Sequence, residues 1–292
     1  MKKSKSLLIV IISLLAFGLV IIANSTVISS NNLYKDPYKF ALLQLVWILI
    51  GLVSFFFFYR YDYKKLEKLS YILFLLNVGL LGTLAVISLF PCNPNISFAP
   101  CVNGANRWFY LNPSPLPKIP FLGVLGFQPG ELAKLSLILY LAFQLSKNIK
   151  EHRGTFWVYF FASGLAALLV LMQPNMSTAA LIFLIGTIIY FSSGASLREL
   201  LIIFPVFIIT GAASIFISPY RRSRLLTLFS GSGDTELSSG YHIKQILLAL
   251  GSGGIWGVGF GQSKQKFNYL PEVASDSIFA IIGENLGLSE PL

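Results

Sequence analysis

Two carboxylates four residues apart, Glu272 and Asp276, stand at the start of an apolar run in the segment YLPEVASDSIFAIIGENLGL, residues 269–288. On a helix this spacing places both on one face, where like-charge repulsion raises the pKa of one acid. Such a pair suits general acid–base chemistry near neutral pH. The structural alternative is that both acids stabilise a helix N-terminus through its dipole, by up to about 1 kcal/mol. The residues alone favour this second interpretation.

A third acid, Glu284, lies inside the same apolar run, two helical turns after Asp276. Along a helix it would be about 12 Å deeper than Asp276. We expect Glu284 to act structurally, through a buried partner.

Basic residues that could hold an anionic ligand occur near two other apolar runs. Lys134 lies three residues after Glu131, so a helical ion pair is its structural interpretation. The functional one is a cation held for an anionic ligand, since ionisable residues in membrane helices are functional candidates. Arg221 and Arg222, in PYRRSR, follow another apolar run. They suit either lipid headgroups or a bound phosphate.

The elements that must position these residues are membrane helices. Of the 292 residues, 55% are hydrophobic and 12% are charged, and the mean hydropathy is +0.71. Apolar runs near the ~20 residues needed to cross a bilayer recur, and backbone groups in lipid need internal partners. We therefore predict an all-α, polytopic membrane bundle in one domain, residues 1–292. The runs are Leu7–Ala23, Phe40–Tyr59, Leu69–Phe90, Leu132–Leu145, Phe156–Met172, Met176–Ser192, Glu199–Ile217 and an eighth that begins near Ser277.

The distribution of basic residues predicts a cytoplasmic N-terminus. In that orientation the inner loops carry eleven Lys and Arg residues and the short outer loops carry four. The net charge of +10 is then mostly a topology signal, and no motif for binding nucleic acid accompanies it. The outer segments 91–127 and 218–276 are long enough to carry function. Cys92 and Cys101 fall in the first of them, where they are either disulfide-bonded or free.

The large outer loop 218–276 contains a helical pattern of its own. Ile243, Ile246, Leu247 and Leu250 follow helical spacing. This helical pattern covers about ten residues, which is too short to span a bilayer. We therefore expect the helix to be interfacial or re-entrant. The following GVGFGQS lacks the strand that a nucleotide-binding loop needs.

Several long motifs resemble the SEDS family, the FtsW/RodA/SpoVE group of cell-shape and cell-division proteins. They occur in the order NGANRWFYL, FQPGELAKLSLILYLA, LMQPNMSTAALIFLIG and GYHIKQILLALGSGGIWGVGFGQSKQKFNYLPEVASDSIFAIIGENLGL. The resemblance implies ten transmembrane helices, with a large extracellular loop before the eighth that corresponds to 218–276. About eight are present, so we interpret the sequence as a fragment without the last two helices.

The resemblance implies a peptidoglycan glycosyltransferase of the bacterial cytoplasmic membrane, used in division or elongation. Its substrate would be lipid II, an undecaprenyl-pyrophosphate-linked disaccharide peptide. Its partners would be a class B penicillin-binding protein and other divisome or elongasome membrane proteins. The alternatives are a flippase or transporter of lipid-linked precursors and a non-enzymatic membrane scaffold; no internal repeat, typical of transporters, is evident.

The family's catalytic acid corresponds to Asp276, which we assign as the base, with Glu272 tuning its pKa. Arg107 and Lys134 match family motifs as pyrophosphate ligands, whereas Arg221, Arg222 and Lys266 are candidates by position alone. A divalent cation, Mg or Mn, could assist, although the sequence shows no ligand set. Two motifs depart from the family: Asn175 replaces an acid, and no His precedes Asp276 in EVASD.

Overall fold

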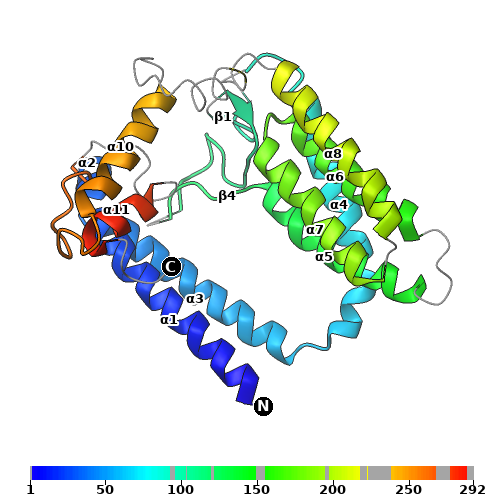
Figure 1. The fold of residues 1–292 in the computed structure, drawn as a ribbon, viewed down its shortest axis with the longest axis horizontal. Helices are drawn as coiled ribbons and strands as arrows, with labels where there is room; N and C mark the ends of the chain where they lie inside the picture. The colour runs from blue at the N-terminus through cyan, green and yellow to red at the C-terminus, as the bar shows by residue number, and fades with distance from the viewer. Residues whose placement is uncertain are drawn as a thin grey trace. The chain divides into compact units, whose positions relative to one another are not determined.

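The chain is almost entirely α-helical, with four two-residue β-strands that pair into two short antiparallel ladders (Figure 1). The computed structural model describes residues 2–92, 96–102, 104–119, 122–148, 155–194, 197–217, 222, 238–267 and 277–287. The helices are α1 (Lys2–Ser25), α2 (Val27–Tyr34), α3 (Lys39–Arg60), α4 (Leu66–Ile87), α5 (Pro129–Asn148), α6 (Thr155–Met172), α7 (Met176–Ser192), α8 (Leu197–Ile217), α10 (Ser238–Gly253) and α11 (Ile278–Leu286), with a 3-10 turn at Tyr63–Lys65. The predicted all-α membrane class is confirmed.

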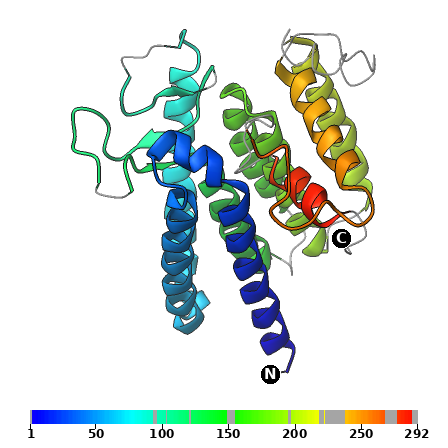
Figure 2. The same cartoon turned by 90° about the vertical axis from the view of Figure 1, so that its left-hand side faces the viewer.

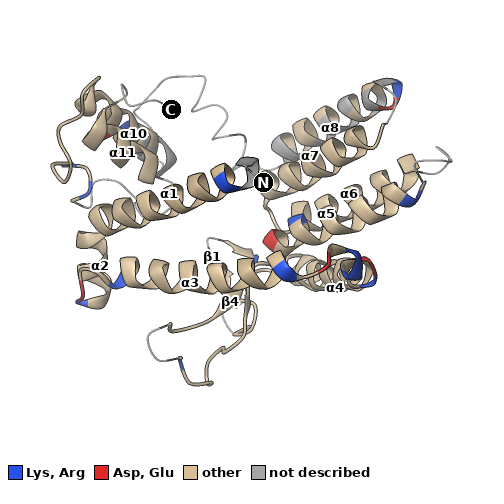
Figure 3. Ribbon diagram, turned by 90° about the horizontal axis from the view of Figure 1, so that it is seen from below, with Lys and Arg blue, Asp and Glu red and all other residues tan. Residues whose placement is uncertain are grey.

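Each predicted apolar run coincides with a helix, and the helices extend a few residues into polar sequence. Within the described ranges, four helices are long and apolar enough to cross a membrane by length and composition. They are Lys5–Ser25, Lys39–Arg60, Tyr63–Ile87 and Thr155–Met172. Charged residues lie at the N-terminal end of α1 and at both ends of α3, and the middle of each helix has none (Figure 3). These features are those of a membrane protein.

The backbone divides into two compact units, with the division falling inside α8. One unit comprises residues 61–210 and contains α4 to α7. The other comprises residues 1–60 and 211–292 and contains α1 to α3, α10 and α11. Below, these are the central unit and the terminal unit.

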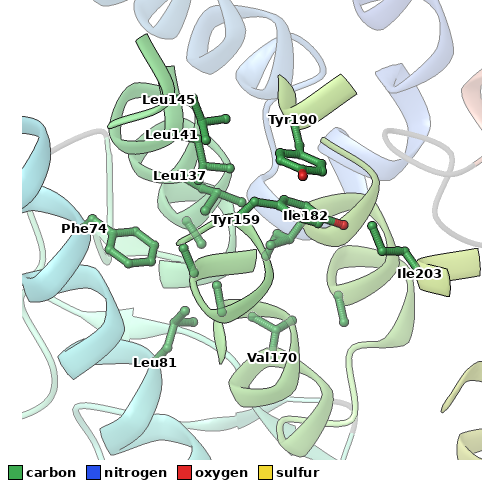
Figure 4. Close-up of a cluster of buried hydrophobic side chains, with 14 residues drawn as sticks. Phe74, Leu81, Leu137, Leu141, Leu145, Tyr159, Val170, Ile182, Tyr190 and Ile203 are labelled. Carbon is green, nitrogen blue, oxygen red and sulfur yellow. The ribbon is translucent and has the colours of Figure 1, made fainter. Parts of the chain in front are cut away.

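The core of the central unit lies between α4, α5, α6 and α7 (Figure 4). Leu137, Leu141 and Leu145 occur every fourth residue along α5 and are buried. Tyr159 of α6 and Tyr190 of α7 stack with ring centroids 4.6 Å apart. Because both rings are buried, each hydroxyl needs a partner. Tyr159 shares a 2.7 Å hydrogen bond with Thr187, and Tyr190 donates to Glu199 at 2.6 Å.

Two antiparallel hairpins cap the end of the central unit at which α4 ends and α5 begins. β1 (Cys101–Val102) pairs with β2 (Ala105–Asn106), placing Cys101 opposite Asn106. β3 (Phe109–Tyr110) pairs with β4 (Gly126–Phe127), placing Phe109 opposite Phe127. A disulfide joins Cys92 to Cys101, so of the two states that the sequence left open, the structure has the bonded one.

In the terminal unit, α10 and α11 pack side by side, as the views in Figures 1 and 2 both show. Ala249 of α10 meets Ala280 and Ile281 of α11 in a small buried cluster. The helix expected within 218–276 is therefore confirmed, and at 16 residues it is longer than the predicted ten. The N-terminal helix α1 packs against α3 and also contacts α11.

One glycine sets the spacing between α6 and α7. A Cβ added to Gly186 would collide with the hydroxyl of Ser163 and lie 2.9 Å from its Cβ. Small residues at such contacts let membrane helices approach closely.

We therefore predict that Gly186→Ala destabilises the protein, because overpacking a close contact costs about 1–3 kcal/mol. The matched control is Gly164→Ala on α6, where the added methyl has nothing within 4 Å. The midpoint of thermal unfolding in detergent should fall for Gly186→Ala and stay within error or rise for Gly164→Ala. Equal midpoints for both variants would contradict the packing argument.

Candidate functional site

The described candidate residues lie in both units. Arg107 and Lys134 belong to the central unit, and Lys266 and Arg222 belong to the terminal unit. Glu272, Asp276 and Arg221 lie outside the described residues. Helix α11 begins at Ile278, with Ser277 in the N-cap position, so its first residue follows Asp276 by two.

Arg107 connects the hairpin segment to the turn between α6 and α7. Its Nε donates to the carbonyl of Gln173 at 3.2 Å, and its Nη2 donates to the carbonyl of Pro174 at 2.7 Å. Gln173 is buried, and its side-chain amide donates to the carbonyl of Leu81 on α4 at 3.1 Å. The guanidinium therefore holds the hairpin segment against the turn between α6 and α7, and Gln173 links that turn to α4. The sequence did not predict this structural role.

Asn175, which replaces the family's usual acid, is the N-cap of α7. Its side-chain oxygen accepts a hydrogen bond from the backbone N–H of Thr178 at 3.4 Å. Asn and Asp are almost equally good in this position, because either supplies the oxygen that a free helical N–H requires. The substitution therefore preserves the cap while removing the charge.

Lys134 is paired with Glu131, its neighbour one turn earlier on α5. The ammonium lies 2.5 Å from a carboxylate oxygen of Glu131, and the two side chains are 23% and 57% exposed. The ion pair that the helical spacing predicts is therefore present. Helix α5 begins at Pro129, and a Cβ added to its Gly130 would lie 3.3 Å from the side chain of Thr178 in the first turn of α7. Lys134 and Arg107 thus belong to the same end of the central unit, where α5 and α7 both begin.

Lys266 lies in a turn that follows the glycine-rich segment after α10. Its ammonium donates to the carbonyl of Gly261 at 2.5 Å and lies 5.8 Å from the ring centroid of Phe267. Its backbone N–H donates to the hydroxyl of Ser263 at 3.3 Å. Both the backbone and the side chain of Lys266 are therefore held by neighbours within six residues of it.

Glu284 of α11 is 1% exposed and accepts hydrogen bonds from the same turn. The hydroxyl of Ser263 donates to it at 2.5 Å, and the backbone N–H groups of Lys264 and Gln265 donate at 3.0 and 3.3 Å. The hydroxyl of Ser252, on α10, adds a contact at 3.4 Å. The prediction that Glu284 has a buried partner is confirmed, and the partners come from two segments of chain.

Glycines allow the turn to approach α11 this closely. A Cβ on Gly253 would collide with the carbonyl of Gly283, and one on Gly257 would collide with the carbonyl of Asn285. Gly257 also has a φ of +74°, which disfavours any other residue. Six glycines between residues 251 and 261 were the signal in the sequence for this packing.

Arg222 is exposed and donates from Nη2 to the carbonyl of Phe216 at 2.9 Å, near the end of α8. A cation suits the C-terminal end of a helix, so this contact also has a structural explanation. Among the residues that the structure describes, no three His, Cys, Asp or Glu side chains form a group that could hold a metal ion.

Comparison with known proteins gives consistent relatives. Residues 5–289 match the model of the FtsW/RodA/SpoVE family, described as "Cell cycle protein". The "Probable peptidoglycan glycosyltransferase FtsW" of Wigglesworthia glossinidia brevipalpis is 32% identical over 286 residues, covering 97% of this chain and 69% of the relative. The protein of the same name from Buchnera aphidicola subsp. Acyrthosiphon pisum is 30% identical over 279 residues, covering 94% and 64%. This chain therefore spans about two thirds of the length of these relatives.

A solved structure shares the fold. It is described as "Structural coordination of polymerization and crosslinking by a peptidoglycan synthase complex". The likeness has a TM-score of 0.61 at 22% identity and covers 94% of this chain and 70% of that chain.

The cap at Asn175 leads to a prediction that separates capping from charge. Asn175→Ala should destabilise the protein by about 1 kcal/mol, because the N–H of Thr178 loses its acceptor. Asn175→Asp should keep the parental stability or exceed it, since a carboxylate also favours the helix dipole. Thermal unfolding of the three proteins in one detergent tests this. A capping role for Asn175 is ruled out if Asn175→Ala has the same midpoint of thermal unfolding as the parent protein.

Proposed function

Because the chain belongs to the FtsW/RodA/SpoVE family of cell cycle proteins, we propose that it is a peptidoglycan glycosyltransferase that polymerises lipid II. The observation that carries this proposal is the family match over residues 5–289. The curated relatives of this chain are named as probable peptidoglycan glycosyltransferases. The matched range includes YLPEVASDSIFA, and we propose that Asp276 in this motif corresponds to the family's catalytic acid.

The proposed reaction joins two glycan units by displacing a lipid pyrophosphate. A sugar hydroxyl attacks the anomeric carbon of a second, lipid-linked sugar, and a new C–O bond forms as the bond to pyrophosphate breaks. Asp276 accepts the hydroxyl proton as general base, and Glu272 adjusts the pKa of Asp276. The departing pyrophosphate keeps the electron pair of the broken bond, so positive charge must be held near it.

Five basic residues are the proposed source of that charge, and the structure describes four of them, each held by a neighbouring group. Arg107 is held by two backbone carbonyls, and Lys134 is held by Glu131. Lys266 is held by Gly261. Such prior positioning favours electrostatic catalysis, because little reorganisation is needed when charge develops. Arg221 and Arg222 complete the proposed set.

The proposed partner is a class B penicillin-binding protein, within the division or elongation machinery of the cytoplasmic membrane. The solved structure with the same fold belongs to a complex described as coordinating polymerization and crosslinking. The proposed orientation places the N-terminus in the cytoplasm, as the distribution of basic residues favours.

The decisive test is polymerisation of labelled lipid II by the purified protein, expressed from its complete reading frame together with its transpeptidase. Asp276→Asn keeps size and hydrogen bonding but cannot accept the proton, so glycan strands should disappear while expression and partner binding persist. Glu272→Gln should retain part of the activity with a shifted pH optimum. The Asp276→Asn preparation also controls for any contaminating polymerase.

Three outcomes would overturn parts of this proposal. Substantial polymerisation by Asp276→Asn at neutral pH would exclude it as the base and favour a helix-terminal role. Translocation of lipid II in vesicles without polymer formation would favour a transporter. Neither activity, with partner binding intact, would favour a scaffold.

The proposed orientation predicts that Cys92 and Cys101 lie outside the membrane. After reduction, a membrane-impermeant maleimide applied to intact spheroplasts should label both thiols, the only two in the sequence. In a background lacking both cysteines, Ser146→Cys at the exposed end of α5 should react only after lysis. The reverse pattern of labelling would invert the topology.

A further inference from the structure

We propose that Glu284 is a positioning residue that holds Lys266 at a fixed place against α11, the helix that follows Asp276. The inference rests on the proposed function for its consequence in catalysis, but its structural basis is independent of any activity. The sequence gives no reason for a buried acid to act on Lys266, since 18 residues separate them.

The turn Ser263–Phe267 is hydrogen-bonded to Glu284 through three donors. The N–H groups of Lys264 and Gln265 both point to the carboxylate of Glu284, as successive N–H groups do around a bound anion. The hydroxyl of Ser263 donates to the same carboxylate and accepts from the N–H of Lys266. The side chain of Ser263 therefore connects the carboxylate of Glu284 to the backbone of Lys266 through two hydrogen bonds.

The carboxylate of Glu284 depends on the donors of this turn for its hydrogen bonds. Glu284 is buried, and within the described residues no Lys or Arg forms an ion pair with it. It also lies in the last turn of α11, where the helix dipole disfavours a negative charge. The neutral donors of the turn therefore have to satisfy the carboxylate, and the carboxylate in turn orders their backbone.

Helix α11 also binds the backbone of the residues that precede this turn. The backbone carbonyls of Glu284 and Asn285 accept from the N–H groups of Val258 and Gly259, at 2.9 and 3.0 Å. The side-chain oxygen of Asn285 accepts from the N–H of Ser263 at 3.2 Å. Residues 258–259 and 263–265, which precede Lys266 in the chain, are thus attached to Glu284 and Asn285 of α11.

The consequence concerns the ammonium of Lys266. Its backbone is fixed through Ser263, and its side chain reaches back to the carbonyl of Gly261 in the same segment. The position of this cation along α11 is therefore set by the helix that begins two residues after Asp276. If Glu284 releases the turn, the cation loses its fixed place without any change in its own chemistry.

The structural test uses Glu284→Gln, in which an amide NH2 group replaces one acceptor oxygen. Amide hydrogen exchange in detergent should accelerate at least tenfold at residues 264–266 and remain unchanged in α4 to α7. Glu67→Gln is the matched control, because Glu67 is an exposed acid paired with Lys147 in the central unit. Unchanged exchange at 264–266 in Glu284→Gln would overturn the proposal even if the protein proves to have no polymerase activity.

The catalytic test is a double-mutant cycle with Lys266→Met. If Glu284 acts through Lys266, Glu284→Gln and Lys266→Met should each lower kcat for lipid II polymerisation at least tenfold. The double variant should then be no worse than Lys266→Met alone. Multiplicative losses would show that Glu284 does not act through Lys266 and would overturn this part of the proposal.

Ser263→Ala provides a second route if Glu284→Gln fails to accumulate. It leaves the acid in place but removes both the donor to Glu284 and the acceptor for the N–H of Lys266. The same acceleration of exchange at 264–266 and the same lack of additivity with Lys266→Met are expected. Parental exchange and kcat in Ser263→Ala would overturn the proposal.

Discussion

The constraint on which the structure depends is that polar groups buried in a membrane protein need partners inside the protein. Several buried polar side chains here bond a specific group on another element. Gln173 bonds a carbonyl on α4, and Asn77 of α4 bonds the carbonyl of Pro129 at 3.1 Å. Tyr190 bonds Glu199 across the turn from α7 to α8. The partners of Gln173 and Asn77 are 92 and 52 residues away in the chain, so these bonds fix how the helices pack. Apolar contact alone would allow the helices to slide.

This constraint explains why the positions of the helices could be predicted from the sequence. Long apolar runs in lipid have no alternative to helix, so Phe156–Met172 and Met176–Ser192 were predicted almost to the residue. The short helix α2 and the two hairpins were not predicted, because two-residue strands have no periodicity to detect. Their pairing depends instead on contacts such as the 2.7 Å bond from the side chain of Asn106 to the carbonyl of Ala99.

The candidate site was predictable only where its contacts are local. The pair Glu131 and Lys134 follows from helical spacing, and a buried partner for Glu284 follows from its depth in an apolar run. The contact of Arg107 with Gln173 spans 66 residues, and nothing in the sequence marks a guanidinium that binds backbone carbonyls. The N-cap at Asn175 is detectable in the sequence, since this Asn directly precedes an apolar run.

The glycines around α11 connect packing to chemistry. A buried carboxylate is tolerable only if donors approach from several directions, and side chains on the approaching backbone would keep those donors away. Gly253 and Gly257 remove that obstacle, so that α10 and the turn after it can both reach the C-terminal end of α11. The close approach then allows Glu284 to bond Ser263, and Ser263 to hold Lys266. The turn that follows the glycine-rich segment thus binds an anion supplied by the protein itself.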